Sequence, residues 1–187
     1  MNGLKELENG IFECNKCKRL REVTPCSWPH IYFGKRKDLS LMIVMRNPGL
    51  ENDANKIGLA EFKNNYLKLW LNCRVGKYLI KNLGKDIVMN KMFFCNICKC
   101  SSPNNSILKK DEIENCKSFL EKQIHFIQPK VIISFGAEAN TALKSMFLHG
   151  IPLFTMLHPS FISRHGDPII SKQQADELNI IIKKYIL

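Results

Sequence analysis

The sequence predicts a doubly wound α/β domain built around a parallel sheet of four strands. Short apolar runs of strand length alternate along the chain with stretches in which apolar residues recur at helical spacing. This alternation is typical of a parallel sheet with helices on both faces. A chain of 187 residues fits one domain with a sizeable core, so we expect a single domain over residues 1–187.

The expected strands are apolar and almost uninterrupted, as strands buried on both faces are. They cover Leu39–Met45, Met92–Asn96, Val131–Phe135 and Pro152–Leu157. Residues that favour turns follow three of them within a few positions, and after Met92–Asn96 they come at Ser101–Asn105.

The expected helices are marked by apolar residues three or four positions apart. They cover Tyr66–Leu83, Asp111 to Pro129, Ala137 to about Phe147, and Ser171–Leu187. The stretch Leu50–Lys63 is polar and gives no clear assignment.

The charge balance points to a polyanionic partner. There are 28 basic and 17 acidic side chains, a formal charge of +11, which favours nucleic acid first and an anionic membrane second. No run reaches transmembrane length, and the Met1 start lacks the order of a signal peptide. We therefore expect a cytoplasmic protein that does not bind membranes. We also expect it to act as a monomer.

Eight cysteines in a reducing compartment indicate metal ligands or buried thiols rather than disulfides. Cys14 and Cys17 form a CxxC pair, which is either half of a metal site or two buried thiols. Cys100 and Cys116 are separated by fifteen residues. Together the four suit a [4Fe–4S] cluster or structural zinc, with Cys98 as the alternative to Cys100. The remaining cysteines are expected to be small buried residues: Cys26, Cys73 and Cys95.

Three polar residues lie at or just beyond the carboxyl ends of expected strands: Asn47, Asn96 and His158. Ligands of open α/β sheets bind at this edge. An amide carries both donors and acceptors and can read a nucleobase edge. A neutral histidine can donate to an oxygen that gains negative charge during bond cleavage. With a basic surface, the three favour a pocket for a base.

An ordered set of motifs resembles the uracil-DNA glycosylase superfamily, most closely its iron–sulfur family 4 enzymes. The motifs are CNKC, YFG…LMIVMRNPG, FFCNICKC-SSPNN, ENCKSFLEKQI…QPKVIISFG and LHPSFISR. The resemblance extends from Cys14 to Arg164. It implies a three-layer α/β/α fold and a DNA repair enzyme that flips uracil out of DNA and hydrolyses its N-glycosidic bond.

The resemblance also implies roles for single residues. The four cysteines of the proposed metal site would ligate a [4Fe–4S] cluster. Asn96 falls on the asparagine that reads uracil, and His158 on the histidine that stabilises the leaving group. Phe62 is the candidate for the aromatic ring that stacks on the base.

The LHPSFISR motif supplies the expected contacts to DNA. Ile162 falls where related enzymes insert an apolar wedge into the base stack, with help from Phe161. Ser160 would grip a phosphate, and Arg164 matches the arginine that follows this motif in the family.

The first motif departs from family 4, where it usually reads Gly-Glu-Ala-Pro-Gly. Here it reads Met45-Arg46-Asn47-Pro48-Gly49, and its Asn-Pro-Gly is similar to the mismatch-specific and single-strand-selective branches. In those branches the asparagine positions the attacking water, which implies this role for Asn47. Arg46 and Gly49 are expected to contact the substrate.

The replacement of the family glutamate by Arg46 supports a second interpretation. The chain could be an iron–sulfur or zinc nucleic-acid-binding module that kept the fold and lost the chemistry. An electron carrier is disfavoured, because such a role requires no polar residues at the strand ends.

Overall fold

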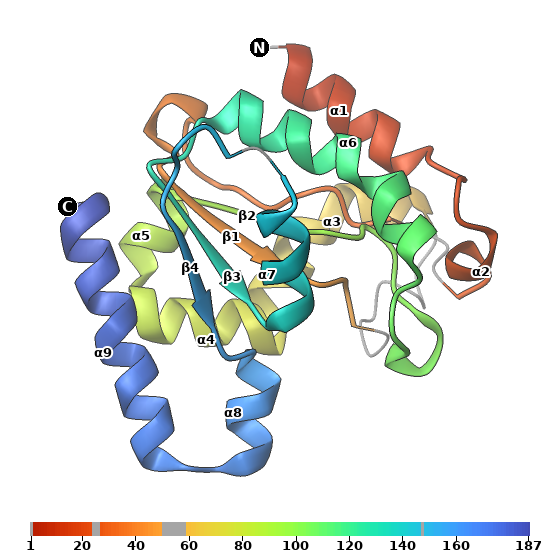
Figure 1. The fold of residues 1–187 in the computed structure, drawn as a ribbon. Coiled ribbons are helices and arrows are strands. Elements are labelled where there is room, and N and C mark those ends of the chain that lie inside the picture. Colours follow the sequence, from red (N-terminus) through yellow and green to blue (C-terminus); the bar gives the residue numbers. More distant parts are fainter. Residues whose placement is uncertain (1, 24–26, 50–58, 147) are drawn as a thin grey trace.

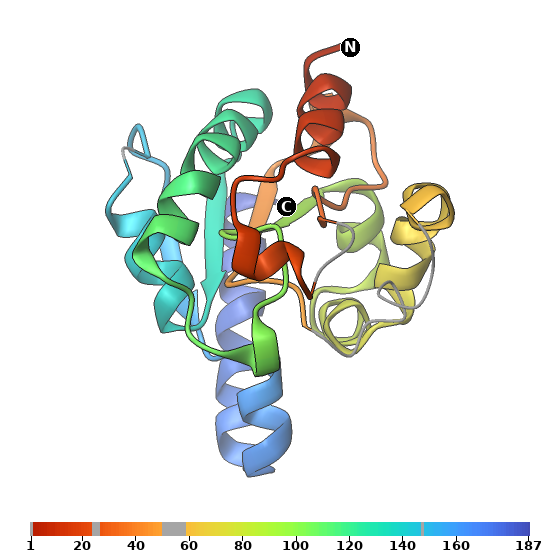
Figure 2. The ribbon, with the colours of Figure 1, turned by 90° about the vertical axis from the view of Figure 1, so that its right-hand side faces the viewer.

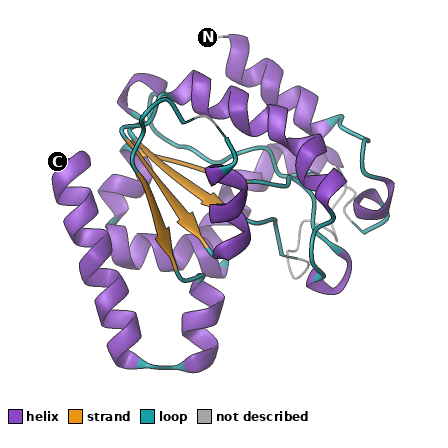
Figure 3. Cartoon of the chain, in the orientation of Figure 1, coloured by secondary structure: helices purple, strands orange, loops and turns teal. Residues whose placement is uncertain are grey.

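A parallel β-sheet forms the middle layer of the protein (Figure 1). The computed structural model describes residues 2–23, 27–49, 59–146 and 148–187. Four strands pair in the order β2-β1-β3-β4, and Figure 3 shows their arrows pointing the same way. They are β1 (Leu41–Met45), β2 (Met92–Asn96), β3 (Val131–Phe135) and β4 (Leu153–Met156). The predicted fold class is confirmed, with each strand inside its predicted run.

Helices cover both faces of the sheet (Figure 2). One face packs on α1 (Asn2–Phe12), α6 (Lys110–Ile127) and α7 (Ala137–Lys144). The other packs on α3 (Leu59–Asn72), α4 (Arg74–Leu83), α5 (Lys85–Asn90) and α9 (Pro168–Tyr185). The short elements are α2 (Lys18–Arg21), α8 (Pro159–His165), and the 3₁₀ turns η1 (Arg36–Asp38) and η3 (Pro103–Asn105).

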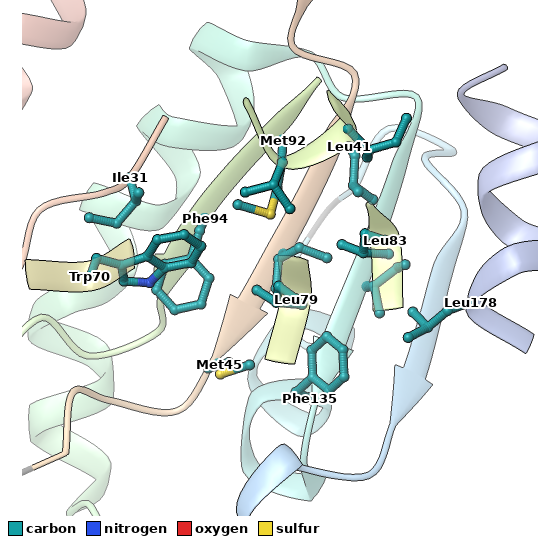
Figure 4. Packing of buried hydrophobic residues seen from close by; sticks show 14 of the residues in the cluster. Ile31, Leu41, Met45, Trp70, Leu79, Leu83, Met92, Phe94, Phe135 and Leu178 are labelled. Atoms are coloured by element: carbon teal, nitrogen blue, oxygen red, sulfur yellow. The ribbon is translucent and has the colours of Figure 1, made fainter. Parts of the chain in front are cut away.

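Alternate residues of each strand enter opposite halves of the core. In β1, Leu41 and Ile43 face the α4 side, where Figure 4 shows Leu41 among the buried side chains, whereas Met42 and Val44 face the α6 side. Every residue of β1, β2 and β3 is buried. This two-sided burial explains why the strands read as continuous apolar runs.

The single helix expected over Tyr66–Leu83 is instead two helices. The chain breaks at Cys73, whose sulfur caps α4 by accepting from the Gly76 amide at 3.4 Å. A Cβ at Gly76 would lie 2.2 Å from the carbonyl oxygen of Trp70, so the sharp turn needs glycine there. The predicted stop at Gly84 is confirmed, with φ at 85°.

Other helix boundaries differ from the predicted ones by a few residues. The C-terminal helix begins at Pro168 rather than Ser171, and α8 precedes it. The expected end of α7 at Phe147 lies outside the described residues, as do Cys26 and residues 50–58 of the unassigned polar stretch. Across the described part of the chain, none of the helices has the length and apolar character needed to span a bilayer.

Candidate functional site

A cleft of about 620 Å³ opens at the carboxyl edge of the sheet, and Asn47, Asn96 and His158 all line it. The strand register explains how they meet. Met45 is paired with Asn96, so the residues after β1 emerge beside the end of β2. His158 lies two residues after the last residue of β4 and caps α8. A groove of similar volume, about 600 Å³, lies between α1 and α6 and is lined by none of the predicted site residues.

Four further predicted residues line the same cleft: Arg46, Gly49, Ser160 and Arg164. Phe62 does not line it among the described residues. Its ring is fully buried in the core and packs against Trp28 at a centroid distance of 4.9 Å. The aromatic lining is supplied instead by Trp28, Trp70, Phe94 and Phe135.

His158 has a defined tautomer. Its Nδ1 accepts a hydrogen bond from the backbone N–H of Ser160 at 3.1 Å, so the neutral ring carries its proton on Nε2. Burial, and then the charges of Arg46 and Arg164, hold the pKa of His158 below its ordinary value of 6.5. The ring is therefore a neutral donor at physiological pH.

This neutrality gives a test that needs no substrate. In an NMR titration, we expect the midpoint of the His158 ring to lie below pH 6.5. Arg164→Gln should raise that midpoint, because it removes one of the charges that oppose protonation. Because the pKa of His158 is lower in the folded than in the unfolded protein, the ring does not affect stability above pH 6.5. It destabilises the folded state as the pH falls below 6.5. A midpoint at or above 6.5 would show that the site does not keep this ring neutral.

Asn96 is 6% exposed and is backed by a buried polar network. The ammonium group of Lys99, itself 2% exposed, donates to the backbone oxygen of Asn96 and to Oε1 of Gln123, the latter at 2.8 Å. Gln123 on α6 donates in turn to the backbone oxygen of Pro29 at 3.0 Å. Buried polar groups that are satisfied in this way fix the local geometry, here at the end of β2.

The Asn47 amide is held at both ends. Its Oδ1 accepts from Nε of Arg46 at 2.6 Å, and its Nδ2 donates to the hydroxyl of Ser102 at 3.3 Å. The side chain therefore has one preferred orientation at the rim of the cleft.

Helix α8 presents the two predicted wedge residues differently. Phe161 is 38% exposed, whereas Ile162 is 8% exposed. The guanidinium of Arg164 donates to the backbone oxygen of Ser160 at 3.1 Å, which places its charge beside the start of the helix.

The four candidate ligand cysteines come from three segments. Cys14 follows α1, and Cys17 is the residue directly before α2. Cys100 follows β2, and Cys116 lies on α6. An ion pair brings the segments together: Arg19 on α2 binds Glu112 on α6 at 2.6 and 2.7 Å. In Figure 2, α2 lies beside the loop that follows β2.

The thiols are close enough to influence one another's ionisation. Burial raises the pKa of Cys17, and the neighbouring thiols of Cys116 and Cys14 raise it further. Burial likewise raises the pKa of Cys100 to about 11, with the same two neighbours contributing. Cys98 contacts Cys116 at 3.9 Å, and this hydrogen bond lowers the pKa of Cys116 and raises that of Cys98.

Neutral donors reach three of these sulfurs. Nδ2 of Asn115 lies 3.5 Å from the sulfur of Cys17, and the Ser27 hydroxyl lies 3.3 Å from that of Cys100. The backbone N–H of Lys99 donates to Cys116. Such donors stabilise thiolates that bind metal. Within the described ranges, no three His, Cys, Asp or Glu side chains converge as tightly as ligands of a single ion do.

Sequence reasoning missed several residues of the site. Lys99 gives no signal in the sequence, because a lysine is normally exposed. Glu138 lines the cleft, but an acidic residue in the first turn of a helix reads as ordinary dipole compensation. Trp28 has no sequence feature that distinguishes it from a packing residue, and only the structure shows that it lines the cleft. Of the other cysteines, Cys95 is buried as expected and Cys73 is half-buried.

Comparison with known proteins shows the following similarities. Residues 31–182 match the family model described as the uracil DNA glycosylase superfamily. The chain is similar to type-4 uracil-DNA glycosylases from Sulfurisphaera tokodaii (28% identical over 142 residues), Pyrobaculum aerophilum (28% over 150) and Archaeoglobus fulgidus (32% over 151). The alignments cover 73%, 76% and 79% of this chain, but only 56%, 65% and 66% of the relatives. The chain thus spans less than two thirds of the length of these relatives.

Proposed function

The chain belongs to the uracil DNA glycosylase superfamily, and from this membership we propose that it excises uracil from DNA by hydrolysing the N-glycosidic bond. The observation that carries the proposal is the convergence of Asn47, Asn96 and His158 in one cleft at the carboxyl edge of the sheet. The relatives' names contribute the substrate class, since each is called a type-4 uracil-DNA glycosylase.

The target nucleotide has to leave the base stack to reach a cleft at the sheet edge. Unstacking costs about a few kcal/mol, and contacts to the flipped base offset it. Asn96 reads the uracil edge, because its amide can donate to O4 and accept from N3–H. The aromatic wall that includes Trp28 encloses the ring, with Phe62 supporting Trp28 from behind.

Bond cleavage places negative charge on the departing base. The C1′–N1 bond breaks with its electron pair passing to uracil, where the charge spreads to O2. The Nε2–H of His158 donates to that oxygen, and one well-placed donor of this kind contributes about 2.7–4 kcal/mol. Asn47 orients a water molecule whose oxygen bonds to C1′. The water gives up one proton and the uracil anion takes one up, so that the products are free uracil and an abasic sugar.

Contacts to DNA come from α8 and the basic surface. Ser160 and Arg164 line the cleft, where they can hold phosphates next to the flipped nucleotide. Phe161 is the exposed apolar side chain available to enter the vacated space, and Ile162 supports it from the buried side of the helix.

We assign the [4Fe–4S] cluster of the iron–sulfur branch to the four cysteines from three segments. The four cysteines suit such a cluster because their thiols are close enough to influence one another's ionisation, and hydrogen-bond donors lie beside three of the sulfurs. A cluster is wider than a single ion, so its ligands need not converge as closely as those of zinc. When bound, the cluster supplies a rigid cross-link between the N-terminal segment, the loop after β2, and α6.

The proposal is tested by measuring free uracil released from oligonucleotides that contain one uracil. Single-stranded DNA, duplexes with U·A or U·G pairs, and substrates with hypoxanthine or mismatched thymine make up the panel. We expect release from at least one uracil substrate. Tight binding to DNA with no base released from any substrate would instead favour the non-catalytic binding module.

DNA affinity should fall steeply with salt, since a chain of charge +11 displaces counterions from several phosphates. We expect Arg164→Ala to weaken binding to uracil-containing and plain DNA alike, and to reduce the salt slope by about one. Lys37→Ala removes an equal charge from an exposed position before β1 and serves as the control. Weakening confined to uracil-containing DNA would contradict the phosphate contact.

A further inference from the structure

Arg46 lies at the junction of three segments. Its Nε donates to Oδ1 of Asn47 at 2.6 Å, its Nη1 to Oε2 of Glu138 at 2.9 Å, and its Nη2 to the backbone oxygen of Asn105 at 3.2 Å. One planar group thus joins the end of β1, the first turn of α7 and the loop after β2. Only arginine offers several donors in a rigid fork of this kind.

The consequence for Asn47 is a fixed amide. One lone pair of its Oδ1 is used by Arg46, and one proton of its Nδ2 is used by Ser102. The Ser102 hydroxyl is anchored in turn by donating to the backbone oxygen of Ser106 at 2.7 Å. One lone pair and one proton of the amide remain, and their directions are set by the two bonds already made.

Glu138 is an acidic residue in a cleft whose other charged residues are basic. Among the described residues that line the cleft it is the only carboxylate, beside Arg46, Arg74 and Arg164. A carboxylate facing phosphates opposes DNA binding. Its pair with Arg46 is also partly exposed, at 26% and 36% for the two side chains, so it contributes little to stability.

We propose that Arg46 and Glu138 form a clamp that positions Asn47 for the attacking water. The clamp rests on the glycosylase function proposed above and adds two positioning residues that act through Asn47. Phosphates of incoming DNA compete for the guanidinium of Arg46. Glu138 holds the guanidinium in place, so that Nε stays on the Asn47 amide while DNA is bound.

The test begins with Glu138→Gln, which keeps the side-chain shape and removes the charge. We expect the single-turnover rate of uracil release to fall by roughly ten- to hundredfold, the cost of misplacing a reacting group. Affinity for the same DNA should stay equal or increase, because the released Arg46 can pair with a phosphate. Glu121→Gln makes the same charge change at an exposed position on α6 and should leave the rate unchanged.

A double-mutant cycle distinguishes positioning from a structural bridge. In an Asn47→Ala background, Glu138→Gln should cause little further loss of rate, because the group it positions is gone. An equal loss in both backgrounds, or a fall in affinity in place of rate, would overturn the clamp.

A second measurement tests the clamp independently of the glycosylase function. If the wild-type protein releases no uracil from any substrate, the function fails and the clamp is judged by NMR. We expect exchange of the Arg46 Nε–H with solvent to be slow in the wild type and fast in Glu138→Gln. Equal exchange in the two proteins would overturn the clamp whatever the activity.

Discussion

Replacing His158 with alanine is expected to lower the single-turnover rate of uracil release by about a hundredfold or more. The ring is a neutral donor, fixed by the Ser160 backbone N–H, and it acts on charge that exists only as the bond breaks. Its loss should therefore change the rate far more than the affinity for DNA. The measurement is single-turnover cleavage of a uracil oligonucleotide, with binding measured separately.

Two variants make this result specific. His158→Gln retains a neutral N–H donor and should recover part of the lost rate. His125→Ala removes an exposed histidine from α6 and should have no effect. A rate for His158→Ala that matches the wild type would assign the leaving-group role to another residue, and Arg46 is the first to examine.

Replacing Cys100 with serine is expected to remove the metal centre. We expect the wild-type protein to be brown, with a broad visible absorbance that dithionite bleaches, as four thiolates around iron and sulfide give. Cys100→Ser should lose both colour and iron. Cys98→Ser is the matched control, since it changes a buried thiol two residues away and should keep the colour.

The structure explains why these two cysteines should differ. Cys100 interacts electrostatically with Cys14 and Cys116, whereas Cys98 shares a hydrogen bond with Cys116 that raises its own pKa. Cys98 is thus already paired with one proposed ligand, whereas Cys100 interacts with proposed ligands from two other segments. Loss of colour in Cys98→Ser alone would reverse the assignment. Stoichiometric zinc with iron below one equivalent, after anaerobic preparation, would replace the cluster by a zinc site.

The sheet could be predicted from the sequence because its strands are buried on both faces. Val131–Phe135 is both the predicted and the observed strand. The predicted run that contains β1 ends at Met45, as β1 itself does. Parallel strands also bring their carboxyl ends to one edge, so Asn47 and Asn96 could be expected to meet.

The remaining elements depend on contacts that the sequence does not display. The break at Cys73 uses a thiol as a helix cap, a residue type rarely assigned to that role, and it depends on close contact between Gly76 and the Trp70 carbonyl. Helix α8 did carry signals, with Pro159 at its first turn and Gly166 after its end, but seven residues make a weak periodic pattern.

Side-chain roles within the site were harder to predict than its location. Phe161 and Ile162 are neighbours in sequence, and only the rotation of α8 decides which is exposed. Phe62 lies in the polar stretch that gives no clear assignment, so its sequence position fits either the core or the cleft, and the structure places it in the core. The partners of Arg46 and Lys99 come from segments distant in the chain, so no local pattern could reveal them.

The most direct test of uracil excision at this cleft compares two proteins in a single turnover. Wild type and an Asn47→Ala/His158→Ala double variant are each placed in excess over a duplex with one uracil, after both are shown to bind it. We predict that the wild type releases one free uracil per duplex and that the double variant releases none over the same period. Equal release by both proteins, or none by a wild type that binds the DNA, would contradict the assignment.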